Sequence, residues 1–179
     1  QITQWFNPIC VEGTVGGDGR KIGIKQIHLE EDAGKLVHDE ATKSSLADYN
    51  RCGIPLIEIV TEPDFHSAED VVAFVDKIRL LLKYAGVCDC KMEQGSLRCD
   101  VNISLAEKGS DKLGTRAEIK NLNSVKAIAR AIDYEIYRQT EILEAGGEVF
   151  QETRRFSDST GETSTLRSKE DAHDYRYFP

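Results

Sequence analysis

Residues 97–105 (LRCDVNISL) and 115–121 (TRAEIKN) alternate apolar and polar side chains with a period of two. That period is typical of strands that bury one face and leave the other face polar. The polar positions are unusually rich in charge, so the two strands predict a sheet face able to hold metal ions and phosphates. On that face we expect Arg98, Asp100, Asn102 and Ser104 from the first stretch, and Arg116, Glu118 and Lys120 from the second.

Further strands are predicted on either side of this pair. Residues 5–27 contain a glycine-rich turn between two extended runs, which predicts a hairpin. Residues 54–60 form an oily run that predicts a strand, and residues 151–167 predict a second hairpin around a turn at 158–161. Residues 36–53 are expected to be mostly loop.

Two helices complete the predicted elements. One is expected from the capping residue Ser67 to Gly86, with acidic residues in its first turn. The other starts near Asn123 or Ser124 and ends at residues 146–147, which are both glycine. Paired strands with few helices favour an α+β fold, an antiparallel sheet with helices packed on one face, over a doubly wound parallel sheet.

Composition limits the possible classes of protein. The chain has 179 residues, of which 40% are hydrophobic, enough for one domain or a core with a small appendage. A formal charge of −8 argues against a surface that holds nucleic acid by bulk electrostatics, although a local basic pocket stays possible. Five cysteines in no scaffold spacing favour reduced thiols in a cytoplasmic protein, and no targeting segment or membrane-length apolar run is visible.

The acidic side chains are candidates for Mg²⁺, which prefers oxygen ligands shared with water and phosphate. A phosphoryl-transfer site also needs positive charge on the moving group. The alternative is a solvated face with cross-strand ion pairs, for example Asp100 with Lys120. The candidate acids are Glu31, Glu58, Glu93, Asp100 and Glu118, and the candidate cations are Arg98, Arg116 and Lys120.

Two acids lie close to apolar sequence. Glu58 interrupts the oily run 54–60 and would be costly to bury without a partner or a metal, unless it alternates onto a wet face. Glu30 and Glu31 are adjacent, so in an extended chain only one of them can share the face of His28. A zinc site at Cys88 and Cys90 is a third possibility, but no second paired motif supplies the other ligands.

Taken together, these residues resemble the B subunit family of the aspartyl/glutamyl-tRNA amidotransferases. The resemblance extends over essentially the whole chain, and several long motifs occur in the family's order. The motifs are residues 28–35 (HLEEDAGK), 48–51 (DYNR), 55–64 (PLIEIVTEPD), 93–102 (EQGSLRCDVN), 118–124 (EIKNLNS), 151–154 (QETR) and 174–179 (DYRYFP).

The resemblance implies a ligase subunit that acts on mischarged Glu-tRNA(Gln) or Asp-tRNA(Asn). ATP with Mg²⁺ phosphorylates the side-chain carboxylate, and ammonia from the amidase (A) subunit then displaces phosphate. A small C subunit and the tRNA acceptor end are the other implied partners. The implied fold is similar to that of glutamine synthetase, an antiparallel sheet whose polar face holds metals and ATP, and no membrane is involved.

Residue roles are carried over motif by motif. Glu31 resembles a ligand of a permanent metal near the ammonia exit, and Glu58, Asp100 and Glu118 resemble its neighbours or ligands of the Mg²⁺ that accompanies ATP. Arg98, Asp100 and Lys120 are expected to act in catalysis. Arg98, Asn102 and Lys120 are expected to bind the nucleotide.

The resemblance also implies that residues 1–179 form a single partial, cradle-type catalytic domain. The family's upstream metal-binding segment and its tRNA-gripping helical and tail domains are not in this sequence. We therefore expect the chain alone to be inactive and to bind tRNA poorly. The competing hypothesis is a non-catalytic scaffold that docks the amidase and lines the ammonia path.

Overall fold

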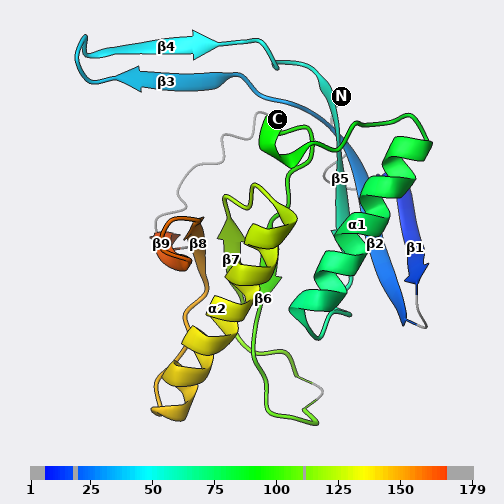
Figure 1. Cartoon of the computed structure of the whole chain (residues 1–179), viewed down its shortest axis with the longest axis vertical. Helices are drawn as coiled ribbons and strands as arrows, with labels where there is room; N and C mark the ends of the chain where they lie inside the picture. The colour runs from blue at the N-terminus through cyan, green and yellow to red at the C-terminus, as the bar shows by residue number, and fades with distance from the viewer. Residues whose placement is uncertain (1–6, 18–19, 111, 169–179) are drawn as a thin grey trace. The chain divides into compact units, whose positions relative to one another are not determined.

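The computed structural model describes residues 7–17, 20–110 and 112–168 (Figure 1). The chain divides into two compact units, residues 1–65 and residues 66–179, and each is described by itself. Several predicted features lie outside the described residues: the first residues of the 5–27 segment, its turn at Asp18 and Gly19, and the motif at 174–179. The prediction of a single partial domain stays a prediction.

The first unit contains a three-stranded antiparallel sheet in the order β1-β2-β5. Strand β1 (Cys10–Gly17) pairs with β2 (Arg20–Glu31), with Gly13 opposite Ile24. The other edge of β2 pairs with β5 (Pro55–Thr61), which carries Glu58. The predicted hairpin and the strand after it are therefore confirmed.

Gly23 in β2 is required by the close approach of the chain that follows β5. A Cβ atom at this position would lie 2.9 Å from Cγ of Glu62 and 3.1 Å from Oδ2 of Asp64. The N–H of Gly23 donates to that same Asp64 oxygen at 2.8 Å. A side chain here would displace the acid that holds the backbone.

Residues 36–53 are not mostly loop, so that prediction is wrong. Strands β3 (Lys35–Asp39) and β4 (Ser44–Asp48) form a two-stranded antiparallel ribbon, visible as an extended arm in Figure 1. The Thr42 hydroxyl donates to the Asp39 carboxylate at 2.8 Å and closes the turn. Nearly every residue of the ribbon is exposed, so neither face is selected to be apolar and the alternation that marks a strand is missing.

Both helices of the second unit begin and end as predicted. The hydroxyls of Ser67 and Ser124 accept hydrogen bonds from backbone N–H groups in the first turns of α1 (Ala68–Tyr84) and α2 (Val125–Glu144), at 3.2 and 3.0 Å. Each helix ends beside a glycine with positive φ. No helix in the described part of the chain combines the length and apolar character needed to cross a membrane.

The sheet of the second unit has four strands in the order β6-β7-β8-β9. Its strands are β6 (Val101–Ile103), β7 (Ala117–Lys120), β8 (Glu152–Ser157) and β9 (Glu162–Ser168). The pairs β6/β7 and β8/β9 are antiparallel, but β7/β8 is parallel, so the expectation of a wholly antiparallel sheet is wrong at this pair. The reason is that α2 connects β7 to β8 and returns the chain in the same direction.

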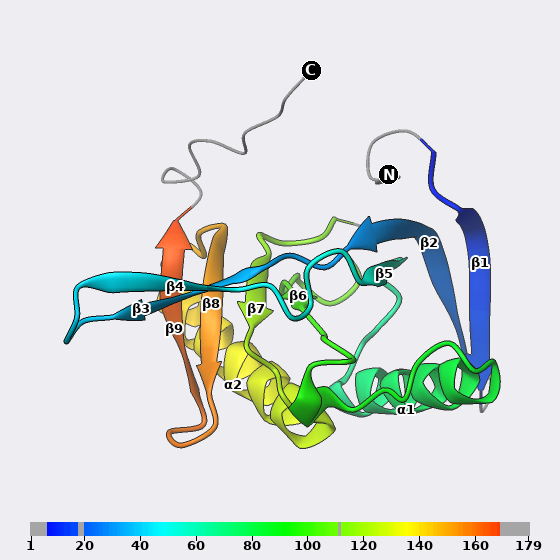
Figure 2. The same cartoon turned by 90° about the horizontal axis from the view of Figure 1, so that it is seen from above.

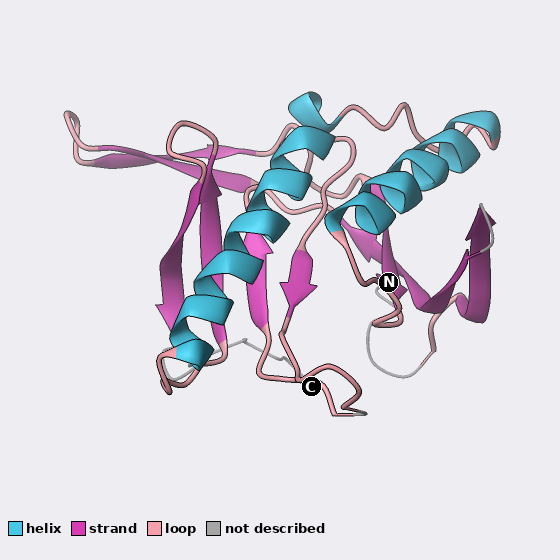
Figure 3. Ribbon diagram, turned by 60° about the horizontal axis from the view of Figure 1, so that its bottom comes forward, coloured by secondary structure: helices cyan, strands magenta, loops and turns pink. Residues whose placement is uncertain are grey.

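Helix α2 lies across one face of this sheet, as Figures 2 and 3 show from two directions. The 3-10 turn η1 (Met92–Gln94) precedes β6 and buries Met92 in the same core. In β6 and β7, period-two alternation therefore has its predicted cause, because the apolar positions of these two strands face the core and the polar ones face away. The fold is α+β; its likeness to glutamine synthetase stays a prediction. The buried core includes Val101, Ile119, Ala127, Ile128, Ile132 and Phe156.

Candidate active site

The polar face of the four-stranded sheet gathers two carboxylates around one lysine. Nζ of Lys120 on β7 lies 2.6 Å from Oδ2 of Asp100 and 3.1 Å from Oε1 of Glu118. The second Glu118 oxygen accepts a hydrogen bond of 2.9 Å from the Thr153 hydroxyl on β8. We call Asp100, Glu118 and Lys120 the carboxylate–lysine cluster.

The cluster follows from strand geometry. Glu118 and Lys120 are two residues apart on β7 and so share a face, and Asp100 immediately precedes β6, the antiparallel neighbour of β7. Glu118 lies directly opposite Thr153 in the parallel pair β7/β8. The Asp100–Lys120 pair is the one that the solvated-face alternative names.

Partial burial opposes the charge on Lys120, but hydrogen bonds and Coulombic attraction from Asp100 and Glu118 outweigh it and raise its pKa above 10.5. Lys120 is thus an ammonium at neutral pH, a fixed positive charge rather than a proton acceptor. The side chains of the cluster remain between 33% and 46% exposed, so water and salt reach them.

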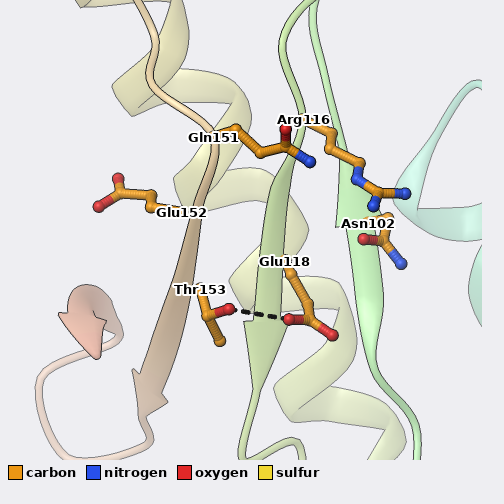
Figure 4. A pocket seen from close by; sticks show the side chains of 6 residues that line it. All are labelled: Asn102, Arg116, Glu118, Gln151, Glu152 and Thr153. Atoms are coloured by element: carbon orange, nitrogen blue, oxygen red, sulfur yellow. Dashed lines mark hydrogen bonds between the residues drawn. The ribbon is translucent and has the colours of Figure 1, made fainter. Parts of the chain in front are cut away.

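A small pocket adjoins Glu118. Its volume is about 150 Å³, below the roughly 300–1,000 Å³ of sites that enclose a drug-sized ligand. Figure 4 shows Arg116 and Gln151 at one end of the pocket and Glu118 with Thr153 at the other. The pocket can hold a carboxylate or phosphoryl group but not a whole nucleotide. Its lining residues are Asn102, Arg116, Glu118, Gln151, Glu152 and Thr153.

The structure brings together some of the predicted site residues. Asn102 and Glu118 line the pocket, and Asp100 and Lys120 are joined to Glu118 through the cluster. Arg98 is an exposed residue two positions before Asp100 and is not among the pocket-lining side chains. The roles assigned to these residues stay predictions.

Glu31 and Glu58 belong to the first unit and do not share a face there. In the β2/β5 register His28 lies opposite Glu58, so both side chains project from the same side of the sheet. Glu30 is two residues from His28 and shares that side, whereas Glu31 projects from the other side. Both Glu31 and Glu58 are exposed.

Gln151, Glu152 and Thr153 line the pocket although the sequence provided no role for them. Their one signal was membership of the motif at 151–154, which continues into the strand that pairs with β7. Because the β7/β8 pairing is parallel and joins positions 35 residues apart, such as Glu118 and Thr153, local patterns do not reveal it.

The cysteines do not form a recognisable zinc site in the described part of the chain. Among those residues, no three His, Cys, Asp or Glu side chains gather as metal ligands. Cys88 instead donates to the carbonyl of Ser96 at 3.1 Å, and Cys90 is fully buried. Cys99 turns toward the core side of the sheet, where burial raises the pKa of its thiol to about 11.

The chain is similar to a known family and to named proteins along its whole length. Residues 1–179 match the family model described as the GatB/GatE catalytic domain. Proteins named as the B subunit of aspartyl/glutamyl-tRNA(Asn/Gln) amidotransferase are 64% identical in Ruminiclostridium cellulolyticum, 57% in Lachnoclostridium phytofermentans and 56% in Caldicellulosiruptor saccharolyticus. Each match includes all of this chain but only 38% of the relative. Because the family model matches the chain from end to end, the chain belongs to the GatB/GatE catalytic domain family.

Proposed function

We propose that this chain is the carboxylate-activating part of a tRNA-dependent amidotransferase, a ligase that converts Glu-tRNA(Gln) or Asp-tRNA(Asn) to the amidated form. The observation that carries the proposal is the 64% identity, over the whole chain, to a protein named as the B subunit of such an enzyme. The carboxylate–lysine cluster beside an anion-sized pocket supports it.

The chemistry explains why charged groups are needed. A carboxylate oxygen of the aminoacyl group attacks the γ-phosphorus of ATP, forming a P–O bond as the bond to ADP breaks. Ammonia then attacks the carbonyl carbon, forming the C–N bond as phosphate leaves and takes up the proton that the nitrogen loses. Both steps concentrate negative charge, so positioned cations contribute more than covalent chemistry by the protein.

The donor set suits Mg²⁺. Asp100 and Glu118 already converge on one cation, the Lys120 ammonium, and Mg²⁺ is commonly held by one or two carboxylates together with water and phosphate. We therefore assign Asp100 and Glu118 as the residues of this unit that would hold it. When bound, the ion neutralises phosphate charge. In the first unit, taken by itself, Glu31 and Glu58 stay proposed metal ligands, and because they project from opposite sides of the β1-β2-β5 sheet we assign them no shared ion.

Arg116, Asn102 and Lys120 would orient the reacting anions. The Arg116 guanidinium at the pocket can pair with a carboxylate or phosphoryl oxygen in a fork, and Asn102 offers an amide on the same face. Arg98 lies three residues before the start of β6 and would contact the nucleotide phosphates. The adenosine of ATP does not fit in the pocket, and we assign it no residues.

The proposed partners are those implied by the family: an amidase (A) subunit that releases ammonia from glutamine, a small C subunit, and the acceptor end of the mischarged tRNA. For a protein in this role we propose a cytoplasmic location.

Glu118→Gln tests the proposal, because it removes a charge with little change in size. In the complete complex we expect tRNA-dependent ATP cleavage to fall about 100-fold, the size of effect seen when one transition-state electrostatic contact is removed, with glutaminase activity retained. The matched control is Glu141→Gln at an exposed position of α2, which should change neither activity. Unchanged ATP cleavage in Glu118→Gln would instead favour the scaffold hypothesis.

A further inference from the structure

The helix-facing side of the four-stranded sheet contains a second set of charges, almost completely buried. Glu135 on α2 is 0% exposed, and Arg154 on β8 is 8% exposed. Arg138 and Glu152 complete the set, which we call the buried ion-pair cluster. Glu152 also borders the pocket, but its carboxylate points away from Glu118 (Figure 4). Two carboxylates and two guanidinium groups balance one another, as burial of charge requires.

Arg154 ties three elements together. Its Nε lies 2.9 Å from Oε1 of Glu135 on α2. One terminal nitrogen contacts Glu152 on its own strand at 2.5 Å and Thr165 on β9 at 3.2 Å, and the other donates to the carbonyl of Thr163 on β9 at 2.8 Å. A planar group with five donors in a fixed fork therefore holds β8 against both its helix and its neighbouring strand.

Glu135 is held as an anion by its surroundings. Burial opposes its charge, but hydrogen bonds from Arg138, Thr163 and Gln139 outweigh the burial and lower its pKa. Arg138 also reaches Glu152, with 3.7 Å between the charged atoms. The charged groups thus pair among themselves, and Thr163, Thr165 and Gln139 add further hydrogen bonds to them.

Strand β8 connects the buried ion-pair cluster to the polar face of the sheet. Thr153 and Arg154 are consecutive in β8 and contact groups on opposite faces of the sheet, Glu118 on one and Glu135 on the other. The β8/β9 register shifts between these same two residues, an irregularity that can re-aim a side chain. Thr153 is itself buried, so its hydroxyl has little freedom once Arg154 is held.

We propose that Arg154 is a positioning residue for the candidate active site: by clamping β8 to α2 and β9, it sets the Thr153 hydroxyl that holds Glu118. The expected effect of Arg154 on catalysis rests on the proposed function. The structural coupling of Arg154 to Glu118 through Thr153 does not.

Arg154→Lys in the complete complex is the test variant. Lysine keeps the positive charge between Glu135 and Glu152, but a single ammonium cannot reproduce the fork that reaches α2 and β9 together. We expect kcat for tRNA-dependent ATP cleavage to fall about 10-fold, because a small misplacement remote from the reacting atoms is enough for such a loss. Glutaminase activity should be retained.

A double-mutant cycle with Thr153→Val separates positioning from general support of the fold. If Arg154 acts through the Thr153 hydroxyl, the double variant should fall no more than about twofold below the slower single variant. Multiplied losses would mean that Arg154 does not act through Thr153, and would overturn the proposal. Unchanged kcat in Arg154→Lys would overturn it as well.

Val75→Ala is the matched control for lost stability. Val75 lies in the hydrophobic core on α1 and belongs to neither charged cluster. The variant should lower the unfolding temperature while leaving kcat within about twofold of wild type at a temperature well below the transition. Loss of kcat in Val75→Ala equal to that in Arg154→Lys would show that stability alone explains the effect.

Amide hydrogen exchange in the complete protein supplies a readout that does not depend on activity. We expect Arg154→Lys to speed exchange in β7 as well as β8, whereas Val75→Ala should leave β7 protected. Faster exchange confined to β9 and α2 would contradict the positioning role. If the wild-type complex shows no ATP-dependent amidation, the proposed function fails, and the exchange result still decides the coupling between the faces.

Discussion

One sheet in this protein carries two charged clusters on opposite faces, and they differ mainly in burial. The side chains of the carboxylate–lysine cluster are 33–46% exposed, whereas those of the buried ion-pair cluster are 0–17% exposed. Both clusters pair carboxylates with cations at distances of about 2.5–3.7 Å, although the open face has one lysine and the covered face has two arginines. Because its side chains reach solvent, the carboxylate–lysine cluster can exchange its ion pairs for water or a ligand, whereas the buried ion-pair cluster cannot.

The physical reason is the cost of removing charge from water. On the open face, a lysine can leave its carboxylates for solvent or for an incoming anion at little cost, because water solvates the separated groups. Under α2 the same separation would leave a charge unsolvated, which the fold cannot tolerate. The open face is therefore suited to binding and the covered face to holding geometry.

The largest expected effect comes from opening the buried ion-pair cluster. Glu135→Gln leaves Arg138 and Arg154 facing a neutral group in a water-poor setting, and we expect the free energy of unfolding to fall by about 3 kcal/mol. Urea unfolding of the complete protein measures it. A loss below about 1 kcal/mol would place this cluster in the same class as the exposed one.

The pH dependence of stability should also distinguish the two clusters. Because the pKa of Glu135 lies below 4.5 in the folded state, the unfolded chain binds this proton first. Its contribution to stability is complete above pH 4.5 and is lost as the pH falls through the folded pKa. Glu135→Gln should lack this part of the acid dependence, whereas Val75→Ala, destabilised for a different reason, should retain it. Parallel pH curves for wild type and Glu135→Gln would contradict the assignment.

The smallest effect is expected on the open face. Asp100→Asn breaks a pair between half-exposed side chains, so the free energy of unfolding should change by less than about 1 kcal/mol. The difference should shrink further when salt is raised, since exposed charges are screened. Chemical unfolding at low and high ionic strength measures both. A large, salt-insensitive loss would mean that this cluster is structural, like the buried one.

Local features were predictable from the sequence. Ser67 and Ser124 cap their helices because a hydroxyl just before an amphipathic run satisfies backbone N–H groups within one turn. The alternation around Val101 and Ile119 correctly placed apolar residues against a helix. These signals act over a few residues and do not depend on the rest of the fold.

Other features were not predictable, each for a physical reason. The β3/β4 ribbon lacks alternation because neither of its faces is buried. Arg154 occupies a helix-facing position where a sequence pattern expects an apolar side chain, and the carboxylates of Glu135 and Glu152 make its burial tolerable. The pocket was missed because half of its lining comes from β8 and the residue before it.

The order of the residues alone was enough to predict the helices, most strands, the α+β class, the family and the charged face that holds Asp100, Glu118 and Lys120. Three features became visible only in the folded chain: which of those charges meet, the parallel pairing of β8 with β7, and a second charged cluster beneath the first. The alternation of apolar and polar residues over a short stretch indicates toward which face of a strand each side chain points. Pairing between distant segments depends on how the chain returns through α2, and the burial of charge depends on partners that only this return brings together.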